Sequence, residues 1–231
     1  MKFDATLIDV ITQTHDVKTF RFNKPEGFYY LAGQYIMVSV CADGNILKKP
    51  LTISSSPLDD FLEFTKKLTG HEFSNALNSL EIGDSFTIEG PYGNLTFDGE
   101  YDKIALISGG IGITPMISIC KYCTAKKIPS DIVLIASNKT EDDIAFRAEL
   151  EEMESRNPHL RVVHTLTRAD ESWKGHREHI CESMILKEIP DYMERVFYLC
   201  GPPGMIKSVK ELLDEMHVPK SMMKIELFAG Y

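Results

Sequence analysis

The chain has 231 residues, of which 43% are hydrophobic and 26% charged, and its net charge at pH 7 is −9. This length predicts one large domain or two ordinary ones, and the composition is typical of a globular protein. The acidic balance argues against nonspecific nucleic-acid binding, which needs a basic surface. No apolar run approaches the ~20 residues of a membrane span, and the chain begins directly with a strand-like pattern. We therefore expect no membrane insertion, no signal peptide and a cytoplasmic location.

Residues 1–99 consist of short segments rich in β-branched and aromatic residues, separated by turn signals such as Pro25-Glu26-Gly27. This spacing predicts a small antiparallel sandwich or barrel, interrupted by one helix at Glu72–Leu80. The predicted strands are Lys2–Ile11, Val17–Phe22, Gln34–Val40, Leu51–Ser55, Phe61–Leu68 and Ser85–Glu89.

Residues 100–231 follow a different sequence pattern, in which apolar runs of strand length alternate with segments of helical periodicity. This alternation predicts βαβ units and a parallel sheet covered on both faces, so we place a domain boundary between residues 99 and 100. The predicted strands are Lys103–Ser108, Asp131–Ser137, Leu160–Thr165, Val196–Cys200 and Lys224–Leu227. The predicted helices are Met116–Ala125, Asp142–Met153 and Met205–Met216.

Five cysteines, an odd number without a disulfide spacing, indicate a reducing compartment. Cys120 and Cys123 form a CxxC motif at the end of an apolar helix, and no second pair follows it. We interpret them as buried thiols rather than as a metal or redox site. His176 and His179 have no third ligand in a suitable pattern, so no metal site is predicted.

Two glycine-containing segments follow predicted strands of the second domain. Ser108–Pro115 contains Gly109, Gly110 and Gly112 and opens a helix, where backbone N–H groups favour an anion such as a pyrophosphate. A tight turn that binds nothing is the alternative. Tyr198–Met205 ends another strand, where Gly201 leaves room for a flat ring and Pro202 fixes the loop.

Two further segments lie in the first domain. In Lys49–Pro57, a cation followed by hydroxyls at alternate positions of one strand suits a phosphate or the polar edge of a planar heterocycle, although an exposed edge strand explains them equally well. In Gly70–Ser74, glycine and serine stand at a helix start, which makes a second potential anion site.

The order of these segments resembles that of the ferredoxin–NADP reductase-like flavoproteins, which include NAD(P)H-flavin reductases and oxygenase reductase components. The resemblance runs from about Ala5 to the C-terminus, through Ala32–Tyr35, Lys49–Pro57, Gly70–Ser74, Gly90–Gly93, Gly109–Pro115 and Tyr198–Met205. It implies an N-terminal antiparallel Greek-key β-barrel that binds FAD and a C-terminal α/β domain that binds NADPH or NADH.

The resemblance also implies the site residues. The family's arginine, aromatic residue and hydroxyl on the barrel strand correspond here to Lys49, Leu51 and Thr52, so two of the three depart from the usual pattern. Catalytic roles fall to Thr52, Cys200 and Glu226, and Phe228 or Tyr231 is expected to cover the flavin. By this resemblance the cofactors are bound by Lys49, Pro50, Leu51, Thr52, Phe64, Lys66, Gly70, Phe73, Ser74, Gly109, Gly110, Gly112, Thr114, Thr167, Arg168, Cys200, Gly201, Pro202 and Phe228.

The expected function is hydride transfer from NAD(P)H to FAD, with electrons passed onward to a ferredoxin- or flavodoxin-type carrier. The resemblance implies that Arg168 lies at the adenosine end of the dinucleotide, where a guanidinium can bind a 2′-phosphate, and this favours NADPH. An ordinary surface charge is the alternative. The alternatives are a flavin reductase or other reductase of small molecules, a reductase subunit of a larger complex, and a non-catalytic subunit that senses flavin or nucleotide.

Overall fold

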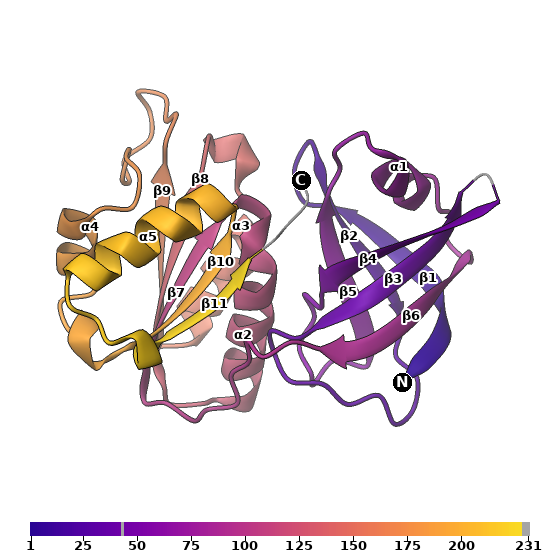
Figure 1. Cartoon of the computed structure of the whole chain (residues 1–231), viewed down its shortest axis with the longest axis horizontal. Helices are drawn as coiled ribbons and strands as arrows, with labels where there is room; N and C mark the ends of the chain where they lie inside the picture. Colours follow the sequence, from indigo (N-terminus) through magenta and orange to yellow (C-terminus); the bar gives the residue numbers. More distant parts are fainter. Residues whose placement is uncertain (43, 228–231) are drawn as a thin grey trace.

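The computed structural model describes residues 1–42 and 44–227, which form two lobes joined through the segment after the sixth strand (Figure 1). The first lobe is an antiparallel sheet in the order β4-β3-β6-β1-β2-β5. An isolated bridge between Ile53 and Phe64 brings the two ends of this sheet together, so that it curls into a barrel. Its elements are β1 (Lys2–Thr12), β2 (Val17–Asn23), β3 (Tyr35–Ala42), β4 (Asn45–Thr52), β5 (Phe61–Lys67), α1 (Glu72–Asn78) and β6 (Ser85–Tyr92).

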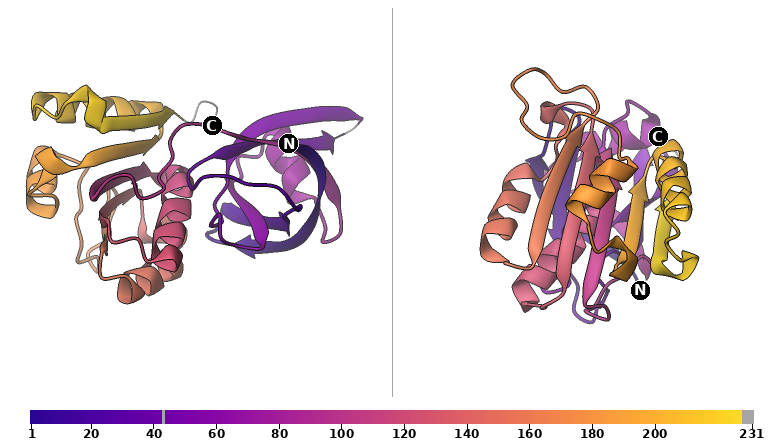
Figure 2. Two further views of the ribbon diagram at one scale, coloured as in Figure 1. Left: turned by 90° about the horizontal axis from the view of Figure 1, so that it is seen from below. Right: turned by 90° about the vertical axis from the view of Figure 1, so that its left-hand side faces the viewer.

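The second lobe is a parallel sheet in the order β11-β10-β7-β8-β9, with helices on both faces (Figure 2). Apolar side chains of α2 and α3 pack on one face, and those of α4 and α5 pack on the other. The strands are β7 (Lys103–Gly109), β8 (Asp131–Asn138), β9 (Leu160–Leu166), β10 (Val196–Gly201) and β11 (Met223–Leu227). The helices are α2 (Ile113–Lys126), α3 (Arg147–Arg156), α4 (Glu182–Glu188) and α5 (Pro203–Glu215).

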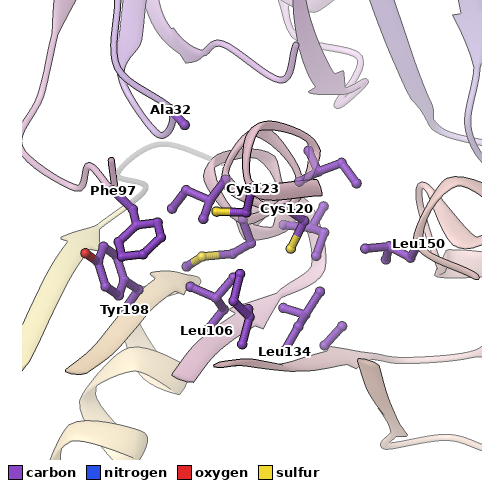
Figure 3. Close-up of a cluster of buried hydrophobic side chains, with 14 of the residues drawn as sticks. Ala32, Phe97, Leu106, Cys120, Cys123, Leu134, Leu150 and Tyr198 are labelled. Atoms are coloured by element: carbon purple, nitrogen blue, oxygen red, sulfur yellow. The ribbon is translucent and has the colours of Figure 1, made fainter. Parts of the chain in front are cut away.

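Both cysteines of the CxxC motif lie inside this second lobe. Cys120 and Cys123 project from α2 among apolar side chains, with Leu106 and Leu134 of the sheet beneath them (Figure 3). Burial raises the pKa of both thiols, which stay protonated and unreactive at neutral pH. The interpretation of the motif as buried thiols is confirmed.

The two lobes are held together by polar contacts between the barrel and α2. The Ser118 hydroxyl donates to the Ser55 carbonyl at 2.7 Å. The side chain of Glu63, only 3% exposed, accepts from Arg21 of the barrel at 2.8 Å and faces Lys121 of α2 at 3.4 Å. The buried Glu63 carboxylate therefore pairs with a cation from each lobe, which links the barrel to α2.

The barrel and the parallel sheet confirm the predicted fold class, but three elements differ from the prediction. Strand β4 begins at Asn45 rather than at Leu51, because it forms a hairpin with β3 along its whole length. Helix α3 begins at Arg147 rather than at Asp142, because Phe146 takes a left-handed backbone conformation with φ of 60°. No helix is predicted at Glu182–Glu188, where α4 forms. The domain boundary at residue 99 stays a prediction.

Candidate functional site

A cavity of about 430 Å³ lies between the barrel and the second lobe. This volume is in the range of small-molecule sites, which favour interfaces between domains. The barrel contributes β4, β5 and the start of α1, and the other lobe contributes the start of α2 and the end of β11. The lining residues are Tyr35, Lys49, Pro50, Leu51, Thr52, Thr65, Lys66, Thr69, His71, Phe73, Ser74, Ile111, Thr114, Glu226 and Leu227.

Thr52 stands out in this cavity because its hydroxyl is buried and has no hydrogen-bond partner among the described residues. The residue is 3% exposed and ends β4. A buried hydroxyl without a partner costs about 1–3 kcal/mol, so its persistence needs an explanation. A flat heterocycle with polar edge atoms would satisfy it, and the residues present therefore fit a flavin ring.

Two lysines bring positive charge to the barrel side of the cavity. Lys66 is only 9% exposed, and its ammonium donates to the Lys67 carbonyl at 2.8 Å. Burial, and then the nearby charge of Lys49, lower the pKa of Lys66. The second of these causes is repulsion between the two ammonium groups, and an anion bound between them would offset it. A phosphate of a cofactor is such an anion.

Glu226 brings a carboxyl group to the opposite wall. It lies in β11 beside Cys200 of β10, and burial raises its pKa to about 7. A Cβ on Gly93 would lie 2.9 Å from the Tyr35 ring and 3.6 Å from Glu226 Oε2, so the glycine lets the barrel and β11 meet here. An acid with a pKa near neutrality, in a cavity, is suited to hold or exchange a proton.

The glycine loops meet one another at the ends of β7 and β10. A Cβ on Gly112 would lie 2.3 Å from the Cys200 carbonyl oxygen, and one on Gly109 would lie 2.3 Å from Met205 Sδ. Gly112 is therefore required by packing against backbone, whereas Met205 could move to admit a side chain at position 109. Gly110 instead has a positive φ of 51° and faces open space, so it leaves its backbone accessible to a ligand.

Of the residues implied by the resemblance, nine line the cavity: Lys49, Pro50, Leu51, Thr52, Lys66, Phe73, Ser74, Thr114 and Glu226. Gly109, Gly110, Gly112, Cys200, Gly201 and Pro202 lie in the adjoining loops. Gly70 lies beside the cavity, in the turn before α1.

The structure does not bring three of the expected residues to the cavity. Phe64 is fully buried in the barrel and stacks on Phe20, because its position in β5 faces the core. Thr167 and Arg168 follow the end of β9, where their backbone N–H groups donate to the carbonyls of Asn138 and Lys139. Phe228 and Tyr231 are outside the described residues.

Six lining residues were not predicted: Tyr35, Thr65, Thr69, His71, Ile111 and Leu227. Tyr35 belongs to a segment that the resemblance includes, and Ile111 belongs to the glycine loop. Thr65 alternates with the core residue Phe64 on β5, which predicts that it faces away from the core. His71 lies inside the predicted anion-binding segment Gly70–Ser74. For Thr69 and Leu227, no pattern in the sequence marks a ligand.

A larger and more open cavity, of about 870 Å³, lies along the outer edge of β9. Its guanidinium groups are already paired, Arg161 with Glu188 and Arg147 with Glu151 at 3.0 Å. The larger cavity also contains a buried nitrogen, His164 Nδ1, without a hydrogen-bond partner among the described residues. The smaller cavity combines a partnerless hydroxyl with two lysines and an acid whose pKa is raised. The smaller one is therefore the candidate site.

Within the described part of the chain, no helix combines the length and apolar character that a membrane crossing requires.

Comparisons with known proteins assign a different cofactor to each lobe. Residues 4–97 match the oxidoreductase FAD-binding domain, and residues 106–211 match the oxidoreductase NAD-binding domain.

Related proteins cover most of the chain. The glycine betaine monooxygenase reductase subunit of Chromohalobacter salexigens is 34% identical over 221 residues, which are 92% of this chain and 60% of that protein. NADH-cytochrome b5 reductase 3 of Rattus norvegicus is 31% identical over 90% of this chain and 80% of its own length. The chain thus spans about 60% of the length of the betaine monooxygenase relative.

Solved structures share the same arrangement of lobes. The cytochrome b5 reductase domain of Ulva prolifera nitrate reductase superposes with a TM-score of 0.85 at 26% identity, over 99% of this chain and 97% of that domain. FAD and a nicotinamide dinucleotide are the cofactors of the two matched domains. The chain therefore belongs to the ferredoxin–NADP reductase-like family of flavoprotein oxidoreductases.

Proposed function

We propose that this protein is a reductase that takes a hydride from NAD(P)H onto FAD and passes electrons to a separate acceptor. The observation that carries the proposal is the cavity between the lobes, in which the partnerless Thr52 hydroxyl faces a site that Glu226 also lines. A non-catalytic sensor would bind the same cofactors, but it would not need an acid whose pKa is about 7 at the junction of both domains.

When bound, FAD supplies the hydride acceptor and the means to release electrons one or two at a time. The protein's own residues would bind and orient the cofactors and keep water out of the site. Thr52 would donate a hydrogen bond to the ring edge, and Lys49 and Lys66 would hold the phosphates, since all three line the cavity. Glu226 would hold or exchange a proton beside the bound ring, and the closely packed glycine loops would form the neighbouring binding surface for the dinucleotide.

The dinucleotide is NADPH or NADH, and a different observation favours each. Arg168 is exposed at the end of β9, where its guanidinium can bind a 2′-phosphate. NADH is favoured by relatives whose names specify it, such as the cytochrome b5 reductases.

The proposed acceptor is a one-electron carrier protein. The named relatives reduce an oxygenase component or cytochrome b5, and a ferredoxin or flavodoxin is a carrier of the same kind. The test is turnover of FAD-loaded protein with NADH or NADPH in the presence of ferredoxin, flavodoxin, cytochrome b5 or free flavin. Fast reduction of one carrier supports the proposal. Exclusive reduction of free flavin would make the protein a flavin reductase, and no turnover with any acceptor would support a sensor.

A further inference from the structure

A row of buried hydroxyl groups connects the cavity with the boundary between the lobes. Thr65, which lines the cavity, is 2.7 Å from Thr19 and 2.9 Å from Ser54, measured between hydroxyl oxygens. All three residues are at most 3% exposed. Thr19 in turn lies 3.2 Å from the side-chain amide nitrogen of Gln13, in the turn between β1 and β2.

Gln13 takes its orientation from the other lobe. The backbone N–H of Phe146 donates to Gln13 Oε1 at 3.1 Å. Because an N–H group can only donate, the oxygen of the Gln13 amide must face Phe146, and its nitrogen must face Thr19. The same nitrogen lies 3.4 Å from Glu149 Oε1, an acceptor, which agrees with this orientation.

The direction of the remaining hydrogen bonds follows from counting donors and acceptors. Thr19 accepts from Gln13, so its own proton goes to Thr65, which is its other partner. Thr65 is also the only partner of the Ser54 hydroxyl among the described residues, so the Ser54 proton goes there too. Thr65 therefore accepts two hydrogen bonds, and its own proton remains for the cavity.

We propose that Thr65 donates a hydrogen bond to the flavin ring, and that Gln13 sets the direction of this donor from the domain boundary. The proposal rests on the proposed function only in that the cavity holds the ring of FAD. Thr65 contacts the cofactor, and Gln13 is a positioning residue that acts through Thr19. Two hydrogen bonds accepted by Thr65 polarise its O–H group and make it a better donor.

The first test replaces Thr65. A donor to the flavin stabilises the negative charge of the reduced ring more than the oxidised ring, so its loss lowers the midpoint potential of bound FAD. Thr65→Val should lower this potential and weaken the binding of oxidised FAD by about fivefold, the scale of one hydrogen bond. Thr65→Ser keeps the hydroxyl and should restore both values. FAD affinity is measured by titrating apoprotein, and folding is checked by circular dichroism.

The second test reverses the hydrogen bonds without touching the cavity. In the double variant Gln13→Glu with Glu149→Gln, the new carboxylate can only accept, so the Thr19 proton turns towards it and away from Thr65. The midpoint potential should fall, by no more than in Thr65→Val. Glu149→Gln alone is the matched control, because it loses the same contact of Glu149 with Lys121 and keeps Gln13.

The outcomes separate this proposal from the proposed function. If wild-type apoprotein fails to bind FAD, the proposed function is wrong. If it binds FAD but Thr65→Val retains the wild-type affinity and potential, the role of Thr65 is wrong. If Thr65→Val changes the potential but the double variant behaves like Glu149→Gln alone, the positioning role of Gln13 is overturned.

Discussion

Glu226 and Cys200 are register partners on the neighbouring parallel strands β11 and β10, so that a half-buried carboxyl lies beside a fully buried thiol. Burial, and then the negative charge of Glu226, raise the pKa of Cys200. Burial alone raises the pKa of Glu226 to about 7. The thiol therefore stays neutral and forms part of a wall, while the carboxyl changes its charge in the physiological range.

The raised pKa of Glu226 makes the stability of the protein depend on pH. The ordinary pKa of this group is 4.5, so between pH 4.5 and about 7 the folded chain holds a proton that the unfolded chain releases. Stability should therefore fall as the pH rises through this window and level off above it, by about 1–3 kcal/mol.

Glu226→Gln tests this dependence, because glutamine cannot titrate. Urea unfolding of apoprotein across the window should show that the free energy of unfolding falls less steeply with pH in the variant than in the wild type. Parallel curves for the two proteins would show that Glu226 titrates near its ordinary pKa.

Thr52→Val separates stability from cofactor binding. The buried Thr52 hydroxyl has no partner among the described residues, so the isosteric valine should leave the apoprotein as stable or about 1 kcal/mol more stable. The same change should weaken FAD binding several-fold, because the ring loses its donor. Thermal unfolding of apoprotein and FAD titration measure the two effects. A loss of stability in apoprotein would mean that the hydroxyl already has a partner.

Gly112→Ala should be poorly tolerated, because the new Cβ would lie 2.3 Å from the Cys200 carbonyl oxygen. Backbone must move to relieve this contact, at a cost of about 2–3 kcal/mol. Gly204→Ala is the matched control, since its Cβ would meet nothing within 4 Å. Chemical denaturation compares the two. Equal stability of both variants would show that the loops do not pack as described.

Arg168→Ala tests the choice of dinucleotide. If the guanidinium binds the 2′-phosphate, the KM for NADPH should rise by about tenfold and that for NADH should not change. Steady-state kinetics with both dinucleotides give the comparison. An equal effect on both would remove Arg168 from the specificity site, and a wild-type protein that uses only NADH would make the proposed role of Arg168 irrelevant.

The fold could be predicted because both lobes follow strong local patterns. Continuous apolar strands such as Ile104–Ile107 indicate a covered parallel sheet, and the turn signals of the first lobe indicate an antiparallel one. The start of α3 could not be predicted, because it follows the left-handed conformation of Phe146, whose N–H donates to Gln13, a residue 133 positions away in the sequence.

The site was predicted less completely, for a similar reason. Residues in motifs, such as Thr52 and Glu226, could be found because the order of segments carries them into the cavity. Thr65 lies in no motif, and its importance depends on Thr19, which is distant in sequence. Phe64 was expected at the flavin from its place in the family's order of segments, whereas its side chain is fully buried in the barrel core.

The central claim is that one cavity holds the flavin where a dinucleotide bound by the other lobe can reach it. The most direct measurement is an anaerobic titration of FAD-loaded protein with NADH and with NADPH, followed by visible absorbance. We predict that one equivalent of the preferred dinucleotide bleaches the flavin fully, and that Glu226→Gln slows the bleaching. A protein that retains FAD and stays yellow with an excess of both dinucleotides would contradict the account.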